Sequence, residues 1–358
     1  MISVLGIESS CDETAAAVVQ EDGTVRSDVV RSQIEAHAPF GGVVPEIAAR
    51  DHLKAITPVV ESALRQAGMS LGDIDGIAVT HRPGLVGALL IGVQAAKGLA
   101  WASDKPLVGV DHLVGHLLSV FLRREEEPSS EARFPFVGLL VSGGHTALYL
   151  CRGPEIAAIE ELGATRDDAV GEAYDKVAKL LDLGYPGGPA IDRLAAQGNA
   201  ADSALTLKPP MAHRQSLEFS FSGLKSAVAR HVAASGSPQN DKDLANLCAA
   251  FQDAVVKTLV RKTLHAAKST GVKDIVIAGG VAANRGLRAK MKAVCEDRGL
   301  KLHVPSIHNC TDNAAMIAYA GAVALGQGQR AQFDLGPSPR TALPRHTRKG
   351  RGKRSPTG

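Results

Sequence analysis

The sequence predicts an α/β protein of two similar lobes, each with a mixed β-sheet covered by helices. Residues 4–19 and 136–150 share one plan: an apolar strand, a short polar turn, and a second apolar strand. After each of these segments, helix-like and strand-like apolar stretches alternate. Hairpins followed by such alternation are typical of mixed sheets covered by helices. The repeated plan predicts two lobes with a cleft between them.

The first half is expected to open on a hairpin of residues 4–7 and 15–19. Asp22-Gly23 is a strong turn signal and predicts a third strand at residues 25–30. Further along, the apolar periodicity predicts three helices and two strands. The helices are expected at residues 45–67 and 85–102 and from His112 onward, and the strands at residues 76–80 and 107–110.

The second half is expected to open on strands at residues 136–141 and 147–150. Helices and strands then follow by the same periodicity. The expected helices are residues 169–183, 190–197, 223–234, 244–270, 284–298 and 312–325, and the expected strands are residues 274–278 and 302–304. Residues 123–133, which are acidic and contain Ser and Pro, are the expected connection between an N-terminal lobe of residues 1–122 and a C-terminal lobe of residues 134–328.

Composition favours a globular protein with a real core, since 45% of the residues are hydrophobic and 22% are charged. Aromatic residues make up 4%, which disfavours a surface of stacked aromatics for single-stranded RNA. The five cysteines contain no C-x-x-C pair, so they indicate neither a zinc ribbon nor a disulfide framework. Glycines and polar residues interrupt the long apolar stretch 85–102, which predicts a buried helix rather than a membrane span. We expect a cytoplasmic protein.

The net charge of +3 hides a basic C-terminus. From Arg340 onward the chain carries seven Lys and Arg residues and no acid, so the rest of the chain has a net charge of 3 − 7 = −4. Low hydrophobicity and high charge favour a disordered tail over residues 329–358. Such a tail either contacts RNA phosphates or only increases solubility.

His112 and His116 are four residues apart, which puts both imidazoles on one face of a helix. They either hold a cation or are simply packed or solvated histidines. A third ligand would be needed, and Asp312 is the best candidate, although Asp is also favoured as a helix N-cap. Two histidines and one carboxylate leave coordination positions open for a substrate. Leu113 stands where a zincin would have its glutamate, so this is not a zincin motif.

Three glycine-containing turns are candidate ligand sites, because glycine lets backbone N–H groups approach an anion closely. The first, Ser142-Gly143-Gly144-His145-Thr146, joins two strands and is otherwise an ordinary hairpin turn. The others lie at residues 187–192, where Asp192 would accept from a hydroxyl, and at residues 279–285, which open a helix. Asp175 projects from the preceding expected helix and is either a further candidate ligand-binding residue or a surface charge that pairs with Lys179.

No convincing nucleophile is present. Ser142 lacks the G-x-S-x-G context, and Cys11 has no designated base. Direct attack of one substrate on another at a metal is therefore favoured over a covalent intermediate.

Several of these segments together resemble one family. The chain is similar to the bacterial branch of the TsaD/Gcp family over about residues 1–327, through motifs that are jointly specific. They are residues 6–14 (Gly-Ile-Glu-Ser-Ser-Cys-Asp-Glu-Thr), 41–46, 83–85, 112–116, 141–146, 187–189, 219–225 (Phe-Ser-Phe-Ser-Gly-Leu-Lys) and 279–284.

The resemblance implies an actin/Hsp70/sugar-kinase-like (ribonuclease H-like) two-lobed fold. It also implies transfer of a threonylcarbamoyl group from threonylcarbamoyl-AMP to N6 of adenosine 37 in tRNAs that read ANN codons, with one iron or zinc ion per subunit. The implied partners are tRNA, a TsaB-like paralogue and a TsaE-like ATPase, and a homodimer is left open. The older description of the family as a glycoprotein endopeptidase is not adopted, because the sequence has no zincin glutamate.

The resemblance also implies roles for individual residues. The metal ligands fall on His112, His116 and Asp312. The substrate-binding positions fall on residues of the C-terminal lobe: Val141, Ser142, Gly143, Gly144, His145, Asp175, Gly188, Asp192 and Asn284. As a hypothesis, Glu13 orients the incoming amine or takes its proton, unless it forms a salt bridge.

Three other functions remain open at this stage. One is an ATP-dependent kinase or carbamoyltransferase on the same fold, which fold alone permits. Another is a non-catalytic nucleotide-binding scaffold, and the third is a metallopeptidase.

Overall fold

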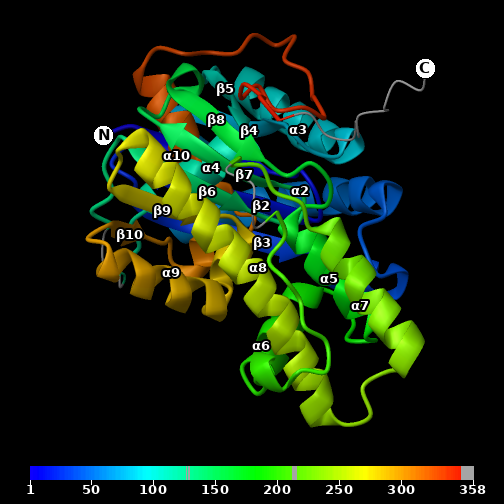
Figure 1. Cartoon of the computed structure of the whole chain (residues 1–358). Coiled ribbons are helices and arrows are strands. Elements are labelled where there is room, and N and C mark those ends of the chain that lie inside the picture. The colour runs from blue at the N-terminus through cyan, green and yellow to red at the C-terminus, as the bar shows by residue number, and fades with distance from the viewer. Residues whose placement is uncertain (126, 128–129, 212–215, 348–358) are drawn as a thin grey trace, which may run out of the picture. The chain divides into compact units, whose positions relative to one another are not determined.

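The computed structural model describes residues 1–125, 127, 130–211 and 216–347. It has two compact units (Figure 1). Unit 1 comprises Met1–Arg133, Arg152–Ala158 and His303–Leu343, and unit 2 comprises Phe134–Cys151, Ile159–Leu302 and Pro344–Gly358. The boundary after Arg133 follows the expected connection. The C-terminal part of the chain, however, is shared between the units, whereas the sequence suggested one continuous second lobe.

Unit 1 contains a five-stranded sheet of order β3-β2-β1-β4-β5. Its strands are β1 (Ser3–Glu8), β2 (Glu13–Gln20), β3 (Val25–Ser32), β4 (Gly76–Arg82) and β5 (Leu107–Asp111). β1 pairs antiparallel with β2 and parallel with β4. The Asp22-Gly23 turn leads into β3 as expected, with Gly23 at φ +89°.

The helices of unit 1 pack on both faces of this sheet. They are α1 (Ile34–His37), α2 (Pro45–Ala67), α3 (Val86–Ser103), α4 (His112–Leu118) and α10 (Ala314–Gly326). Leu5 and Ile7 of β1 face the core formed with α2 and α3. Gly6, between them, faces α10: a Cβ on Gly6 would lie 2.5 Å from the Ala314 carbonyl oxygen. This close approach brings a helix from the end of the chain onto the first strand.

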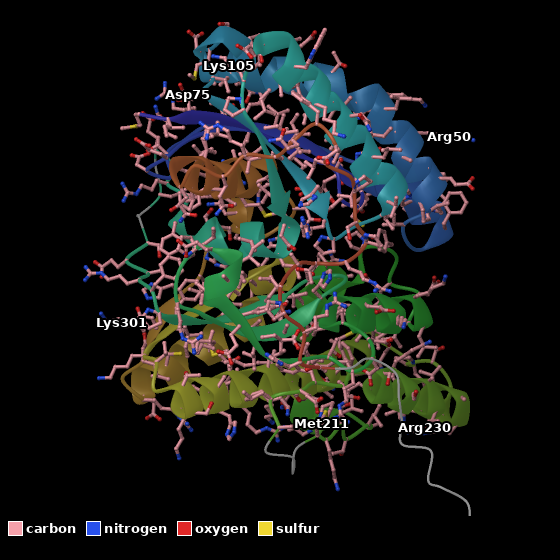
Figure 2. All side chains as sticks on the ribbon, turned by 90° about the horizontal axis from the view of Figure 1, so that it is seen from above. Arg50, Asp75, Lys105, Met211, Arg230 and Lys301 are labelled. Atoms are coloured by element: carbon pink, nitrogen blue, oxygen red, sulfur yellow. The ribbon has the colours of Figure 1, made fainter. Side chains whose placement is uncertain are left out.

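At one edge of unit 1, polar contacts tie the loops to the sheet (Figure 2). Asp75 accepts a hydrogen bond from the Ser3 N–H at 2.8 Å, and Lys105 Nζ donates to the Gly72 carbonyl at 3.0 Å. These contacts fix the starts of β1, β4 and β5, whose far ends carry the site residues.

Helix α3 is only half-buried, whereas the sequence suggested a buried helix. One face packs on α2 and β4, and Trp101 on the other face is 77% exposed. Among the described residues, α3 is the one helix long and apolar enough to pass a length-and-composition test for a membrane span, a test that core helices also pass.

Unit 2 repeats the sheet of unit 1, with strand order β10-β9-β6-β7-β8. Its strands are β6 (Phe136–Val141), β7 (Thr146–Cys151), β8 (Ile159–Ala164), β9 (Asp274–Ala278) and β10 (Lys301–His303), the last ending at the unit boundary. β6 pairs antiparallel with β7 and parallel with β9, as β1 does with β2 and β4. This confirms the predicted duplication of a mixed sheet. Strand β8 was not predicted from the sequence.

The helices of unit 2 are α5 (Val170–Leu180), α6 (Gly187–Ala195), α7 (Ser222–Ser235), α8 (Asp241–Thr270) and α9 (Arg285–Asp297). The 30-residue helix α8 contacts the sheet, α6 and α9 (Figure 1). Its length reflects an almost continuous buried face along the helix.

The C-terminal segment after α10 is ordered against the units over its described part. Asp111 accepts hydrogen bonds from Thr341 Oγ1 at 2.6 Å and from the Ala342 N–H at 2.8 Å. Glu161 accepts from the N–H groups of His346 and Thr347 at 3.0 and 2.8 Å. The tail expected to be disordered is therefore structured as far as residue 347, and residues 348–358 lie outside the described residues.

Candidate metal centre and ligand-binding edge

The start of helix α4 holds the two histidines. Asp111 ends β5, and its carboxylate accepts from the Leu113 N–H at 3.0 Å, which makes it the N-cap of α4. The first turn of α4 therefore puts His112 and His116 one above the other, with ring centroids 4.6 Å apart. Both are buried, His116 completely.

Asp312 reaches these histidines from the other end of the chain. Its Oδ1 lies 3.1 Å from His116 Nε2 and 3.5 Å from His112 Nε2. Helix α10 brings it there by packing on α4 at Gly115, where an added Cβ would lie 2.9 Å from Ile317 Cδ1. Asp312 is not the N-cap of α10. That role belongs to Asn313, whose side chain accepts from the Met316 N–H at 2.9 Å, and the Asp312 carboxylate is left to face the histidines.

These three side chains fit a single cation. One ligand atom from each lies within 4.8 Å of the others. Two donors that bind one ion at about 2.1 Å, at angles of 90–110°, lie about 3.0–3.4 Å apart, close to the two distances from Asp312 Oδ1. Imidazole and carboxylate donors suit first-row metals such as iron and zinc. The group can therefore hold a metal ion.

Glu8, at the end of β1, supports the first histidine. Its carboxylate is 1% exposed; Oε2 lies 2.9 Å from His112 Nδ1 and accepts from the Thr80 hydroxyl at 2.6 Å. Ser10 donates its backbone N–H to Oε1. This contact orients the ring so that Nε2 faces Asp312, as partners of metal-bound histidines do. Glu8 lies in the motif of residues 6–14, and the sequence alone did not predict this supporting role.

Electrostatics show that the site is built for a positive charge. Burial opposes charge on His112, but Asp312 and Glu8 raise its pKa well above the usual value. Burial would raise the pKa of Asp312, but His112 and His116 hold it well below the usual range. Burial lowers the pKa of His116. In the described part of the chain, His116 Nδ1 is buried without a hydrogen-bond partner. An unpaired buried nitrogen is unfavourable, so we expect the interactions of the opposite nitrogen, Nε2, to offset it.

Glu13 begins β2 close to this site. Burial, together with the nearby carboxylates of Asp312 and Asp12, raises its pKa to about 10. Ser32 Oγ donates to Glu13 Oε1 at 3.4 Å, and no salt bridge to Glu13 occurs among the described residues. The Cys11 pKa is likewise raised well above its usual value, by burial and by Asp12. Cys11 is thus a protonated thiol, not a thiolate nucleophile.

The substrate-binding positions predicted in unit 2 gather at one edge of its sheet. β6 and β9 run parallel, so residues 141–145 and 279–284 follow adjacent carboxyl ends. Gly279, at φ +91°, packs against Val141 so closely that a Cβ would lie 2.5 Å from its carbonyl oxygen. Ligands of open α/β sheets bind at such an edge.

The turn between β6 and β7 offers backbone groups to this edge. Ser142 closes it by accepting from the His145 N–H at 3.1 Å on Oγ, while its own N–H donates to the His145 carbonyl at 2.8 Å. A Cβ on Gly143 or Gly144 would meet nothing within 4 Å, so both glycines border open space.

Asp175, Asp192 and Asn284 have structural contacts at the same edge. Asp175 accepts from the Gly187 N–H at 2.8 Å, which fixes the start of α6, and Gly188 beside it borders open space. Asp192 pairs with Arg285 Nε at 2.7 Å. Asn284 caps α9 through the Leu287 N–H at 2.8 Å and donates to Gln252 Oε1 at 2.7 Å.

Asp167 organises the motif of residues 219–225, to which no role was assigned from the sequence. Its carboxylate accepts from the Phe221 N–H at 2.8 Å, from the Ser222 N–H at 3.3 Å, and from the hydroxyls of Ser220 and Ser222. Burial raises the Asp167 pKa, but these hydrogen bonds outweigh burial and leave it below its usual value. No local pattern pointed to Asp167, because its partners lie more than 50 residues away.

Comparison with known proteins decides the family. Residues 24–319 match the family model "TsaD: tRNA N6-adenosine threonylcarbamoyltransferase". The chain belongs to the TsaD family. A tRNA N6-adenosine threonylcarbamoyltransferase of Sorangium cellulosum is 66% identical over 98% of this chain and 99% of its own length. One of Geotalea uraniireducens is 51% identical over 93% of this chain and 94% of its own.

TsaD membership makes the chain an enzyme, a transferase that modifies tRNA. Solved structures agree on the fold. Component A of (R)-2-hydroxyglutaryl-CoA dehydratase from Acidaminococcus fermentans has a TM-score of 0.52, 16% identity, and coverage of 91% of this chain and 100% of its own. Full-length HypF has a TM-score of 0.59, 13% identity, and coverage of 92% and 47%. The two sheets of equal order are those of the actin/Hsp70/sugar-kinase fold.

Proposed function

We propose that this TsaD chain transfers the threonylcarbamoyl group of threonylcarbamoyl-AMP to N6 of adenosine 37 in tRNAs that read ANN codons. The observation that carries this proposal beyond the family name is the convergence of His112, His116 and Asp312, a donor set that leaves positions for a substrate. Iron or zinc would bind there. When bound, the ion would act as a Lewis acid that polarises and orients the threonylcarbamoyl group.

The residues of unit 1 would prepare the site for this reaction. Glu8 holds His112 in the tautomer that directs Nε2 toward Asp312. Glu13, whose pKa is raised to about 10, carries a proton in the absence of a cation and would donate a hydrogen bond rather than take a proton. We therefore propose that Glu13 orients the incoming amine; only a cation that offset the charge of Asp312 would bring it closer to acting as a base.

The residues of unit 2 would bind the nucleotide part of the donor. The N–H groups of Gly143 and Gly144 would contact the phosphate. Asp175, Gly188, Asp192 and Asn284 would contact the nucleoside. HypF of the same fold is described as phosphate- and nucleotide-bound, which supports nucleotide binding by a protein of this fold. Asp192 would have to exchange its Arg285 ion pair for ribose hydroxyls. The adenine amine is a poor nucleophile, so positioning supplies much of the acceleration.

The proposed setting is the cytoplasm, with a TsaB-like paralogue and a TsaE-like ATPase as partners. Unit 1 offers one surface for a partner chain. Leu53 on α2 is 65% exposed and Leu90 on α3 is 41% exposed, each about one helical turn from the contact of Ala49 with Gly87. Exposed apolar side chains grouped in this way mark interaction sites.

One experiment tests the proposed reaction. The chain is incubated with donor, partners and unmodified tRNA, and the nucleoside at position 37 is identified by mass spectrometry. Threonylcarbamoyladenosine that depends on the donor and on the chain is the expected product. ATP hydrolysis without tRNA dependence would instead favour a kinase or carbamoyltransferase. Absence of bound metal, together with normal partner assembly after loss of His112, would favour a scaffold.

A further inference from the structure

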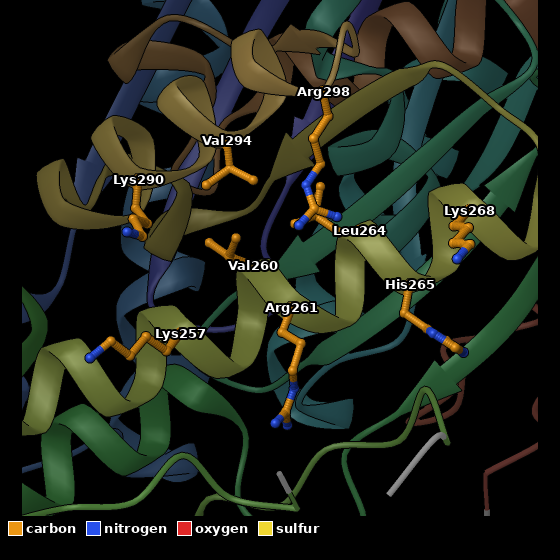
Figure 3. Close-up of a pocket in the computed structure, with 9 residues that line it drawn as sticks. All are labelled: Lys257, Val260, Arg261, Leu264, His265, Lys268, Lys290, Val294 and Arg298. Atoms are coloured by element: carbon orange, nitrogen blue, oxygen red, sulfur yellow. The ribbon is translucent and has the colours of Figure 1, made fainter. Parts of the chain in front are cut away.

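A basic groove lies between helices α8 and α9 of unit 2 (Figure 3). Its hollow of about 370 Å³ is lined by Lys257, Val260, Arg261, Leu264, His265, Lys268, Lys290, Val294 and Arg298. Five of these nine residues are Lys or Arg, and none is Asp or Glu. The whole chain has a net charge of only +3, so the rest of the molecule is mildly acidic and this groove is a distinct positive feature.

The groove is arranged as two facing rows. Lys257, Arg261, His265 and Lys268 are spaced four, four and three residues apart on α8, so they form one stripe along the helix. That stripe is about 16 Å long at 1.5 Å per residue. Lys290, on α9, and Arg298, just after it, are eight residues apart and form the opposite row.

Few of these charges are used within the protein. Lys257 pairs with Asp253 at 2.6 Å, and Arg261 donates to the carbonyls of Pro210 and Met211 at 3.2 Å. In the part of the chain that the structure describes, no acidic side chain pairs with Lys268, Lys290 or Arg298, and all three are exposed. Like charges facing one another without acids repel, an arrangement that an anionic ligand relieves.

The floor of the groove indicates the kind of ligand. Val260 is 5% exposed, Leu264 is 8% exposed and Val294 is half-buried, so the three apolar lining residues offer little apolar surface. An acidic protein partner would need an apolar core to its interface, which this floor does not offer. A single phosphate needs a converging cluster, whereas these cations lie in extended rows. A duplex carries one phosphate per about 3.4 Å of each strand, so a 16 Å row matches several phosphates in succession.

We propose that the α8–α9 groove binds the sugar-phosphate backbone of the tRNA substrate. This inference rests on the proposed function for the choice of tRNA. The lining has no Asn, Gln, Phe, Tyr or Trp, so we expect it to contact mainly phosphates and to read little base sequence.

The test compares two triple variants of the full chain. K268Q, K290Q and R298Q together remove the three unpaired groove cations. The control combines K242Q, K292Q and K301Q, which makes the same change of net charge at exposed lysines of unit 2 that do not line the groove. Binding of unmodified tRNA is measured by fluorescence anisotropy at several salt concentrations, and transfer is measured as a function of tRNA concentration.

The groove variant is expected to bind tRNA about tenfold more weakly, with a salt-dependence slope reduced by about 2 to 3. Its KM for tRNA should rise while kcat at saturating tRNA stays near wild type. The control should keep wild-type affinity. Equal affinity of the groove variant and wild type, or equal loss in the control, would overturn the proposal. So would loss of binding to a partner protein with tRNA affinity unchanged. Because tRNA binding is measured without chemistry, failure of the proposed reaction would not affect this result.

Discussion

Glu8 Oε2 lies 2.9 Å from Nδ1 of His112, and both side chains are buried. Through this contact the first strand of the chain sets the direction of an imidazole more than 100 residues away. The opposite nitrogen then faces Asp312, a further 200 residues along the chain. The candidate metal centre thus combines residues from the beginning, the first third and the end of the sequence, all within unit 1.

Replacing Glu8 by Gln is expected to weaken metal binding without removing a ligand. The amide keeps the size of the side chain but loses the charge that favours the required His112 tautomer, a change that typically costs 10–100-fold in affinity. Competition with a chromophoric chelator measures this. The conservative variant Glu8→Asp should recover part of the affinity, and wild-type affinity in Glu8→Gln would remove the positioning role.

Substitutions of Asp312 and of its neighbour Asn313 should have different effects, the first on metal binding and the second on stability. Asp312→Ala removes a ligand and should abolish stoichiometric metal binding, whereas Asn313→Ala removes the α10 cap and should lower the free energy of unfolding by about 1 kcal/mol. Metal analysis and urea denaturation of both variants test this. The assignment fails if Asp312→Ala retains a full equivalent of metal.

The close contact of Gly6 with α10 predicts that a substitution outside the ligand set can also weaken metal binding. A Cβ on Gly6 would lie 2.5 Å from backbone atoms of Ala314 and Ala318, which cannot move aside without shifting the helix. Gly6→Ala should therefore destabilise the protein by about 1–3 kcal/mol and weaken metal binding. Gly98→Ala is the matched control: an added Cβ meets nothing within 4 Å there, so stability should rise by roughly 0.5–1 kcal/mol. Equal effects of the two substitutions on thermal stability would contradict this account.

Asp167 should make unit 2 sensitive to acid. Its folded pKa is held below the ordinary aspartate value of 3.8, so the unfolded chain takes up a proton first as the pH falls. Its stabilising contribution is complete above that value and is lost as the pH drops below about 4 through the folded pKa. Asp167→Asn should cost about 1–2 kcal/mol at neutral pH and less in acid. Denaturation at pH 7 and pH 3 tests this, and a cost that does not change with pH would count against it.

Local patterns in the sequence predicted most elements of both sheets, because hairpin turns such as Asp22-Gly23 and buried apolar runs are local signals. Strand β8 was missed because Glu160 and Glu161 interrupt its apolar residues. Glu161 accepts hydrogen bonds from the distant N–H groups of His346 and Thr347, which no local pattern reveals. The return of α10 to unit 1 was also missed, since it depends on the packing of Gly6 and Gly115 against distant residues.

The candidate site was only partly predictable for the same reason. The spacing of His112 and His116 predicted them as candidate ligands, and the position of Asp312 before an apolar helix predicted it as the third. The supporting roles of Glu8 and Asp167 depend on pairing with residues 50 to more than 100 positions away, which no local spacing reveals. Asp312 also could not be told from a helix cap until Asn313 was seen to fill that role.

Metal dependence of the transfer step tests the central claim most directly. The purified chain is stripped of metal, and modification of adenosine 37 is measured while iron or zinc is added back in fractions of an equivalent, beside a His116→Ala variant. Activity should be absent at first, rise with added metal to a plateau near one ion per chain, and stay absent in the variant. Full activity of the stripped chain, or of His116→Ala, would contradict the account.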